Sequence, residues 1–339
     1  MRMRRIIIIG IVAMLALVIA ACGATNENND NNELNGANGS NDTNVNEQNT
    51  NNNNQSDDAE TITVNHQLGE TDVKKNPETV VVFDFGVLDS VDELGIEVAG
   101  VAKTSLPAYL SKFEDDAYVN IGSLKEPDFE TIYSLKPDLI LISGRQSDAY
   151  DELSDIAPTV FLGVDTERYM DSFKENMTTL GEIFGKEEEV AAELSEIEAM
   201  AAEINEKAVD SGKEALIILA NDGNISAYGL NSRFGIIHDV FGFEAVDEGI
   251  EVSTHGNSVS FEYVKEQDPD ILFVIDRGAA IQDGEASAKQ LIENELTENT
   301  KAYQNDGIVY LDPEYWYLSG GGLVSVKAMV NEVSAIFEQ

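Results

Sequence analysis

The sequence predicts an α/β protein with two Rossmann-like lobes joined by a long helix. A helix-then-strand pattern of eighteen residues occurs twice, and each copy carries an unbroken apolar run, as in a strand buried on both faces of a parallel sheet. A long helix with one apolar face separates the two copies along the chain. The length of 339 residues also fits about two domains, at roughly 100–200 residues for each.

The two copies of the pattern keep a constant offset of 132 positions, with no gap between matched residues. Each copy opens on an N-capping residue, Asp128 or Ser260. A proline then ends the helix, because proline lacks an N–H and restricts the residue before it. The two units cover residues 128–145 and 260–277, and their strands are expected over Leu139–Ile142 and Ile271–Ile275.

Arg145 and Arg277 close the two copies, just past the carboxyl ends of the expected strands. In open α/β sheets that edge is where ligands bind. The repeat therefore predicts that each lobe offers one arginine at its ligand-binding edge.

The first residues carry the features of a secretion signal. Three arginines precede an apolar run from Ile6 to Ala21, which is too short for a comfortable transmembrane helix. The run ends in Ile-Ala-Ala-Cys, which resembles the lipobox of bacterial lipoproteins and predicts a signal peptide over 1–21 with lipidation of Cys22. The alternative is an ordinary signal peptide with an incidental cysteine. Since Cys22 is the only cysteine, no internal disulfide is expected.

Residues 22–60 are expected to form a disordered tether. After Cys22 this segment holds fifteen Asn and eight acidic residues, with no Lys or Arg. Such a composition cannot bury enough apolar surface to offset the entropy of ordering. An Asn-rich aggregation segment is the alternative, but the interspersed carboxylates argue against it. The tether would link a lipid anchor to a folded body that starts near Thr61.

The N-terminal lobe, over residues 61–185, is expected from an alternation of strands and helices. Asn76 and Pro77 mark a turn, and Gly95 ends an early helix as its C-cap. The strands are expected over Thr61–Val64, Val80–Phe83, Val98–Val101, Leu139–Ile142 and Thr159–Leu162, and the helices over Leu88–Leu94, Pro107–Phe113, Tyr150–Ile156 and 169–184.

Residues 186–210 are expected to form the helix that connects the lobes. Apolar residues recur at spacings of 4, 3, 4, 3 and 4 from Val190 to Ala208, so they share one face of a helix of about 24 residues, or roughly 36 Å. The segment lies midway between the repeat copies, which favours a connector. A helix that belongs to one lobe is the alternative.

The C-terminal lobe, over residues 211–339, opens with a strand at Ala215–Leu219. A loop from Tyr228 to Arg233 leads into a helix that ends at Gly242. The second repeat copy follows. The other elements are expected to be helices over Phe234–Phe241, Ser287–Leu296 and Leu323–Phe337, a strand over Ile308–Leu311 and a loop over Tyr315–Gly322.

The chain carries 21 Lys and Arg against 63 Asp and Glu, a formal net charge of −42 at pH 7. This balance argues against a nucleic-acid partner. Arg145, Arg233 and Arg277 all lie at or near element ends, and arginines that meet inside an acidic body imply an anionic ligand held by charge-assisted bonds. Lys125 and Lys103 are comparable candidates. Solvated or salt-bridged surface charge is the alternative for each.

Three aromatic residues on expected loops, Tyr228, Trp316 and Tyr317, suit a flat or aromatic ligand and a cation–π network with the basic residues. Packing that closes the loops is an equal alternative. His255 lies in a loop beside the second repeat copy and is a further candidate contact. The three histidines predict no direct metal site, and no catalytic motif indicates an enzyme.

Glu130 and Glu262 occupy matched positions in the first turns of the two repeat helices. Stabilisation of the helix dipole is one explanation. One exposed carboxylate on each lobe would also form a two-point docking feature for a partner with matching arginines. Both explanations stay open on the sequence alone.

The paired Phe-Glu and Pro-Asp units, the long connecting helix, the lipobox and the late Trp-Tyr-Leu-Ser-Gly-Gly-Gly together resemble the iron-siderophore and cobalamin class of substrate-binding proteins of ABC importers. The resemblance covers essentially residues 61–339. Four shorter stretches resemble the members that bind petrobactin-like siderophores, namely 82–86, 122–129, 145–147 and 253–256.

This resemblance implies two Rossmann-like lobes on a rigid helical hinge, the helical-backbone class III fold, with small closure on binding. It implies capture of a ferric siderophore of the catecholate, petrobactin-like type, with no cofactor of the protein's own. The siderophore coordinates the iron, and the basic residues that the resemblance assigns to the ferric chelate are Lys125, Arg145, Arg233 and Arg277.

The same class implies a partner for the two glutamates. Glu130 and Glu262 are expected to bind arginine pockets on the two subunits of a permease, a homodimer or heterodimer that works with its ATPase. The lipid on Cys22 is expected to hold the protein, as a monomer, on the outside of the cell membrane. The alternatives are haem or cobalamin as the ligand in the same fold and, from a different class, a surface-anchored sensor or adhesin.

Overall fold

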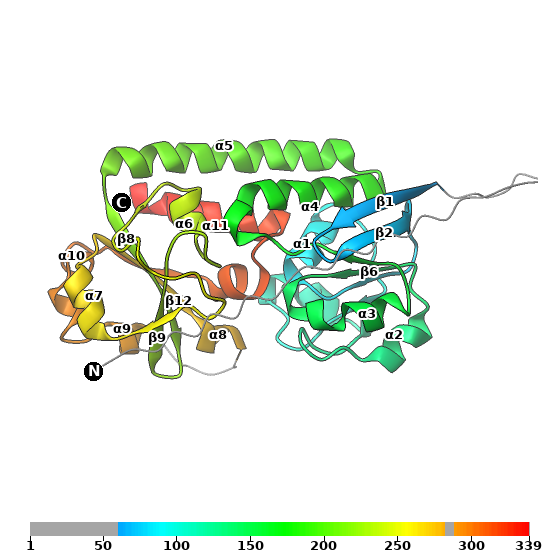
Figure 1. Ribbon diagram of the computed structural model, residues 1–339, viewed down its shortest axis with the longest axis horizontal. Coiled ribbons are helices and arrows are strands. Elements are labelled where there is room, and N and C mark those ends of the chain that lie inside the picture. The colour runs from blue at the N-terminus through cyan, green and yellow to red at the C-terminus, as the bar shows by residue number, and fades with distance from the viewer. Residues whose placement is uncertain (1–59, 282–287, 339) are drawn as a thin grey trace, which may run out of the picture. The chain divides into compact units, whose positions relative to one another are not determined.

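The computed structural model describes residues 60–281 and 288–338. The expected signal peptide, Cys22 and the expected tether up to residue 59 lie outside the described residues. Within the described part of the chain, no helix has the length and apolar character needed to cross a membrane. Two large β-sheets with their own helices form the body, and one long helix connects them (Figure 1).

The N-terminal lobe is built on a five-stranded sheet in which every neighbouring pair is parallel, in the order β5-β4-β3-β6-β7. Strands β3, β6 and β7 are buried along their whole length, as a sheet covered on both faces requires. An antiparallel hairpin of β1 and β2 precedes the sheet. The strands are β1 (Thr61–His66), β2 (Gly69–Lys74), β3 (Val80–Val82), β4 (Gly100–Val101), β5 (Val119–Asn120), β6 (Leu139–Ile142) and β7 (Thr159–Phe161).

Helices and short helical turns connect these strands. The carboxylate of Asp84 caps the first helix by accepting hydrogen bonds from the backbone N–H groups of Gly86 and Val87. Gly185 ends the last helix of the lobe in the left-handed conformation that suits glycine, at φ 62°. The elements are α1 (Phe85–Glu93), η1 (Ala108–Glu114), α2 (Phe129–Leu135), η2 (Gly144–Ala149), α3 (Tyr150–Ser154), η3 (Thr166–Arg168) and α4 (Tyr169–Phe184).

Helix α5 (Glu187–Ser211) connects the two sheets and lies along both lobes (Figure 1). Its 25 residues span about 37 Å at roughly 1.5 Å per residue. The buried face consists of the six apolar residues whose spacing predicted it, and it packs against α4 and α11. The predicted connecting helix is thus confirmed, with its buried residues at Val190, Leu194, Ile197, Ala201, Ile204 and Ala208.

The C-terminal lobe is built on a six-stranded sheet that mixes parallel and antiparallel pairs. Strands β8, β12 and β13 are parallel neighbours, while β9 and β11 extend the sheet in antiparallel order and β10 pairs with β8. The strands are β8 (Glu214–Asn221), β9 (Asn224–Tyr228), β10 (Glu244–Ala245), β11 (Asn257–Val259), β12 (Ile271–Asp276) and β13 (Ile308–Leu311). The helical elements are α6 (Ile236–Asp239), α7 (Phe261–Gln267), α8 (Arg277–Ile281), α9 (Ala288–Ile292), η4 (Thr297–Asn299), α10 (Lys301–Gln304), η5 (Glu314–Ser319), α11 (Leu323–Ser334) and η6 (Ala335–Phe337).

The two repeat copies fold alike. Helices α2 and α7 have the same length and the same offset of 132 positions, and each ends on a residue in the left-handed conformation, Lys136 at φ 52° or Asp268 at φ 47°. The aspartates that follow the two prolines, Asp138 and Asp270, each accept a backbone hydrogen bond where the neighbouring strand begins, from Thr79 just before β3 or from Glu214 at the start of β8. The repeat in sequence is therefore a repeat in structure.

Several expected elements differ from the structure. The hairpin strand β2, the two-residue strands β5 and β10 and the antiparallel strands β9 and β11 were not expected, because their short sequences are polar or mixed rather than apolar. The expected strand Val98–Val101 is shortened to β4, and the expected helix Ser287–Leu296 is represented by α9 within the described residues. Tyr228 ends β9 instead of opening a loop, and the expected loop from Tyr315 contains the helical turn η5. The expected helix Phe234–Phe241 is the single turn α6, and three further residues end the last helix as η6.

The last helix, α11, returns to the first lobe. It packs against α1 and α5, although it follows strand β13 of the C-terminal sheet. Asp89 on α1 accepts hydrogen bonds from the backbone N–H groups of Val324 and Ser325, at 3.2 and 3.1 Å. Gly322 stands at this contact, where a Cβ atom would collide with Asp89 and with the carbonyl of Gly86.

Candidate functional site

Arg145 belongs to the N-terminal lobe and lies in η2, directly after strand β6. The hydroxyl of Ser143 donates a hydrogen bond of 2.6 Å to Asp84, whose carboxylate also lies 4.0 Å from the Arg145 guanidinium. The side-chain amide of Gln146 donates a hydrogen bond to the carbonyl of Leu124, which holds the turn η2 in place. These contacts fix the turn that carries Arg145.

Arg277 belongs to the C-terminal lobe and is the first residue of α8, directly after strand β12. Its Nη1 donates a hydrogen bond of 2.7 Å to the side-chain oxygen of Asn221, the last residue of β8. Its Nε donates a hydrogen bond of 2.8 Å to the hydroxyl of Tyr317. Arg277 is therefore positioned by two parallel strands of its own lobe and by the turn η5.

Arg233 lies on the connection between β9 and α6, and its guanidinium also reaches Tyr317. Its Nη2 donates a hydrogen bond to the carbonyl of Tyr317, and its Cζ stands 4.2 Å from the centre of the Tyr317 ring. The same guanidinium is 5.3 Å from the ring centre of Phe234. Burial, and then the positive charge of Arg145, lower the pKa of Arg233 from its ordinary value.

Tyr317 on η5 is the residue at which the three arginines meet. Arg145 donates to the carbonyls of Tyr317 and Leu318, at 2.6 and 3.1 Å. The Cζ atoms of Arg145 and Arg277 lie 6.0 and 5.8 Å from the Tyr317 ring centre. The predicted cation–π network therefore exists around this tyrosine. We call Arg145, Arg233 and Arg277 the arginine cluster.

Burial alone would raise the pKa of Tyr317, but the hydrogen bond from Arg277 and the positive charges of Arg233 and Arg277 outweigh burial and lower it. The phenol oxygen thus lies in a field that favours negative charge on oxygen. A ligand that presents anionic oxygen atoms to the arginine cluster would experience the same field.

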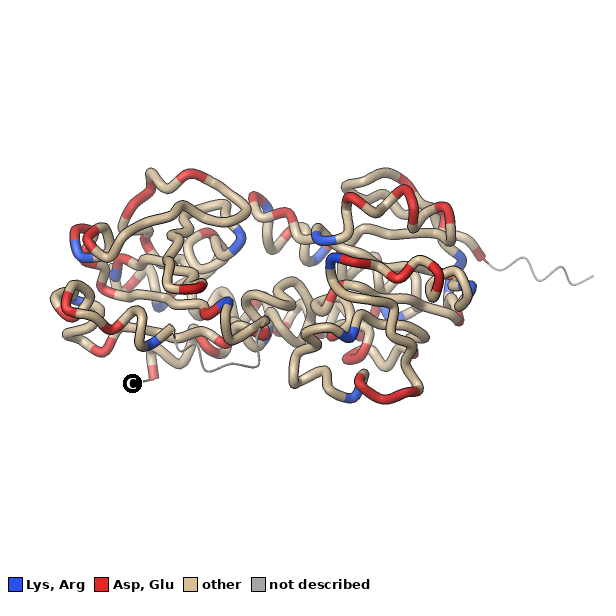
Figure 2. The backbone as a smooth tube through the Cα atoms, turned by 90° about the horizontal axis from the view of Figure 1, so that it is seen from below, with Lys and Arg blue, Asp and Glu red and all other residues tan. Residues whose placement is uncertain are grey.

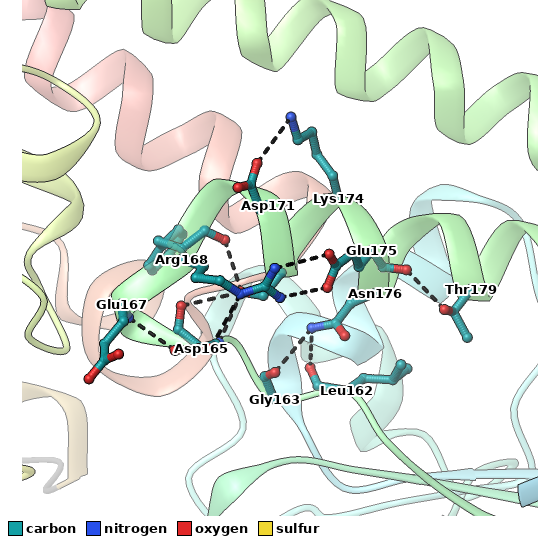
Figure 3. A network of polar contacts seen from close by, with 12 residues as sticks. Leu162, Gly163, Asp165, Glu167, Arg168, Asp171, Lys174, Glu175, Asn176 and Thr179 are labelled. Carbon is teal, nitrogen blue, oxygen red and sulfur yellow. Dashed lines mark hydrogen bonds and ion pairs between the residues drawn. The ribbon is translucent and has the colours of Figure 1, made fainter. Parts of the chain in front are cut away.

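The arginine cluster is poorly neutralised for a protein so rich in acidic residues. Acidic positions are spread over both lobes (Figure 2), yet within the described ranges only Asp84 comes within 4.0 Å of a cluster guanidinium. Arg168 is the remaining arginine in the described part of the chain, and it is paired with carboxylates, as is usual for an arginine on an acidic surface. It donates to both carboxylate oxygens of Glu175, at 3.2 and 2.8 Å, and lies 3.6 Å from Asp165 (Figure 3).

The other basic candidates have different surroundings. Lys103 donates from Nζ to the carbonyls of Glu114 and Asp115, at 3.0 and 2.8 Å, so it closes the end of η1. Lys125 is exposed on the loop ahead of α2, and His255 is exposed on the loop ahead of β11. Their contact with a ligand stays a prediction.

Two of the aromatic candidates are core residues. Trp316 is 3% exposed, and its indole N–H donates a hydrogen bond of 2.8 Å to Glu332 on α11. Tyr228 is 1% exposed and stacks edge-on against Phe234, with ring centres 4.7 Å apart. Burial raises the pKa of Tyr228 to about 12, while the nearby charges of Arg233 and Arg277 act in the opposite direction. Tyr228 thus packs on Phe234, whose ring lies 5.3 Å from the Arg233 guanidinium.

Glu130 and Glu262 are both exposed in the first turns of α2 and α7, as their matched positions predicted. Hydrogen bonds from its own backbone N–H and from Ser260 lower the pKa of Glu262. Neither glutamate forms an ion pair with a described residue. Two equivalent carboxylates are therefore presented to solvent, one on each lobe.

The structure adds two polar residues that the sequence did not single out for the site. Asp84 approaches Arg145, and Asn221 accepts a hydrogen bond from Arg277. Both lie at the carboxyl ends of parallel strands, β3 and β8, which is the signal that could have found them. No group of three His, Cys, Asp or Glu side chains in the described ranges could hold a metal ion.

A family model described as periplasmic binding protein matches residues 80–315. The petrobactin-binding protein YclQ of Bacillus subtilis is 54% identical over 279 residues, covering 81% of this chain and 87% of YclQ. The ferric-anguibactin-binding protein FatB of Vibrio anguillarum is 31% identical over 277 residues, covering 80% of this chain and 86% of FatB.

Solved structures show the same arrangement. The crystal structure of YclQ matches with a TM-score of 0.80 at 53% identity, over 83% of this chain and 99% of that structure. The periplasmic catecholate-siderophore binding protein VctP of Vibrio cholerae matches with a TM-score of 0.79 at 39% identity, over 81% of this chain and all of that structure, 100%.

Proposed function

The chain belongs to the periplasmic binding protein family, and from that premise we propose that it captures a ferric siderophore of the catecholate, petrobactin-like type and delivers it to an ABC importer. One observation carries the choice of ligand. Three arginines from both lobes meet at Tyr317, and in an acidic protein they keep most of their positive charge unpaired. The names of the relatives support the same ligand class.

The chemistry of the ligand suits such a site. A ferric tris-catecholate complex is an anion, and its iron is already fully coordinated by catechol oxygens. The protein then needs hydrogen-bond donors, positive charge and aromatic surface, and it needs no metal ligands or cofactor of its own. In this proposal the protein binds and delivers its ligand without catalysing a reaction.

The arginine cluster is the centre of the proposed site. Each guanidinium has N–H groups beyond those that bind Tyr317, Leu318 or Asn221, so it can donate to ligand oxygens at its outer edge. Direct contact with the ligand remains a proposal for Lys125, Lys103 and His255. Tyr228 and Trp316 are buried in the core, so in this proposal they act through the residues that they pack against.

The proposed place of action is the outer face of the cell membrane. The lipobox supports a lipid on Cys22, and the matched glutamates support docking of a monomer to a permease pair with its ATPase. Glu130 would bind one permease subunit and Glu262 the other.

A titration tests the ligand class. The purified chain has one tryptophan, which precedes Tyr317 directly, so its fluorescence should fall when a ferric catecholate binds nearby. We expect submicromolar affinity for ferric petrobactin, or more than about 8 kcal/mol. Ferric 3,4-dihydroxybenzoate, haem and cobalamin are titrated in parallel. Tight binding of haem or cobalamin alone would overturn the siderophore assignment, and binding of none would favour a sensor or adhesin.

A further inference from the structure

The Tyr317 side chain occupies the place where the three cluster guanidiniums converge. All three Cζ atoms lie between 4.2 and 6.0 Å from the centre of its ring, which is the range of cation–π contact. Arg233, the nearest, also shares the Tyr317 carbonyl with Arg145. The single ring of Tyr317 therefore makes cation–π contacts with arginines of both lobes.

The contacts of Tyr317 divide into two sets. Its carbonyl belongs to the backbone of η5 and holds Arg145 and Arg233 in place. Its ring and hydroxyl belong to the side chain, and they contact Arg233 through the ring face and Arg277 through a hydrogen bond of 2.8 Å. Rotation about the side-chain bonds could remove the second set while the first set persists.

The second set is the pair of interactions that an aryl-oxide ligand would make. A catecholate ring also presents a π face to a guanidinium and an oxygen acceptor to a second one. The lowered pKa of the Tyr317 phenol agrees with this comparison, because it shows that the guanidiniums favour negative charge on an aryl oxygen. Tyr317 and a ligand ring therefore require the same guanidinium groups.

We propose that Tyr317 is a built-in competitor for the arginine cluster, and that it determines ligand selectivity by excluding anions that can replace only one ring and one oxygen. A simple aryl anion would replace the ring contact and the oxygen contact of Tyr317 by one of each kind and would also lose translational freedom, so its gain is limited to the charge on its oxygen. A ferric complex with several aryl-oxide groups gains contacts beyond those that Tyr317 gives up. This inference rests on the proposed function and deepens it.

The test compares three variants with two probes, iron-free 3,4-dihydroxybenzoate and ferric petrobactin, by calorimetry. Tyr317→Ala removes the ring, and Tyr317→Phe removes only the hydroxyl that binds Arg277. Tyr315→Ala is the matched control, because Tyr315 lies on the same turn but stacks on Tyr109, with ring centres 4.8 Å apart. Urea unfolding of each variant checks that it is folded.

We expect Tyr317→Ala to bind ferric petrobactin at least about fivefold more tightly than the wild type and to gain millimolar binding of dihydroxybenzoate. Tyr317→Phe should bind ferric petrobactin about twofold to fivefold more tightly, and Tyr315→Ala should behave as the wild type. Weaker binding of ferric petrobactin by the Tyr317 variants would overturn the inference, since Tyr317 would then be a ligand contact. If Tyr317→Ala does not fold, the direction of change in Tyr317→Phe decides the question.

The two hypotheses can fail separately. If the wild type binds no ferric siderophore while a Tyr317 variant gains dihydroxybenzoate binding, the proposed function fails and the competitor role stands. If the wild type binds ferric petrobactin and the Tyr317 variants bind it less well, the proposed function stands and the competitor role fails.

Discussion

The carboxylate of Asp89, buried on helix α1, accepts a hydrogen bond of 3.1 Å from the backbone N–H of Ser325 in the first turn of helix α11. The two residues are 236 positions apart, so this bond joins the start of the N-terminal lobe to the end of the chain. Burial raises the pKa of Asp89 to about 7, and hydrogen bonds from Ser325, Val324 and Tyr109 offset only part of that effect.

This relationship makes stability depend on pH. Between the unfolded pKa of 3.8 and the folded value of about 7, the folded chain holds the Asp89 proton more tightly than the unfolded chain does. The resulting contribution to the free energy of unfolding is complete below pH 3.8 and is lost as the pH rises through about 7. The loss should amount to a few kcal/mol at most, on the order of 1.4 kcal/mol for each pKa unit.

Urea unfolding of the wild type and of Asp89→Asn at several pH values between 5 and 8 measures this effect. We expect the wild type to lose more stability over that range than Asp89→Asn, whose side chain does not titrate. Glu93→Gln on the same helix is the control, because Glu93 is exposed. Equal pH slopes for the wild type and Asp89→Asn would show that Asp89 is ionised throughout.

The arginine cluster gives the second expectation. Replacing Arg145, Arg233 or Arg277 by Ala should weaken ferric petrobactin binding by about 1–3 kcal/mol each, because each change removes a charged donor from the ligand. Arg168→Ala should leave the affinity unchanged, since Arg168 is neutralised by Glu175 on the surface. Calorimetric titration decides. A cluster variant that is destabilised but keeps full affinity would show that its arginine is structural.

The third expectation concerns the matched glutamates, Glu130 and Glu262. Glu130→Ala and Glu262→Ala should leave ferric siderophore affinity unchanged and reduce uptake of the iron complex by whole cells. The double variant should abolish uptake, and Glu→Arg should act more strongly than Glu→Ala through repulsion of permease arginines. Radioactive iron uptake is the measurement, with immunoblotting for surface display.

Glu188→Ala is the control for this experiment, because it also removes an exposed carboxylate from the first turn of a helix. We expect uptake by that variant to equal the wild type. Full uptake by the Glu130 and Glu262 double variant would refute the docking role.

The close contact at Gly322 gives the fourth expectation. A methyl group there would collide with Asp89 and the Gly86 carbonyl, so Gly322→Ala must push α1 and α11 apart. We expect a loss of about 1–3 kcal/mol in the free energy of unfolding, as for other overpacked cores. Gly144→Ala is the control, since a Cβ atom at Gly144 meets nothing within 4 Å. Similar stability of both variants would mean that the contact relaxes without cost.

The elements that could be predicted are those in which the spacing of apolar residues in the sequence matches the spacing of buried residues in the structure. The connecting helix α5 buries the six residues that its spacing selects, and β13 has the bounds that its apolar run predicted. Strand β2 could not be found in this way, because only Thr71 and Val73 of its six residues are buried. A strand that is mostly exposed has too few apolar residues to produce a recognisable alternating pattern.

The candidate site could also be predicted only in part. The repeat predicted that Arg145 and Arg277 end equivalent strands, and a position at the sheet edge follows directly from that. It could not predict that both turn toward Tyr317, because that depends on the path of η5 between the lobes. For the same reason the neighbours Trp316 and Tyr317 look alike in sequence, yet one side chain packs against α11 and the other meets the cluster.

The cation cluster within so acidic a body also bears on how fast an anion can arrive. The formal charge of −42 on the whole chain repels an anionic complex from a distance, while the guanidiniums attract it only at short range. Dissolved salt shortens the reach of the repulsion, from about 10 Å at 0.1 M to about 3 Å at 1 M, and screens the partly buried contact less. Association should therefore accelerate as salt is added, the reverse of ordinary electrostatic steering, and capture would be fastest in saline surroundings.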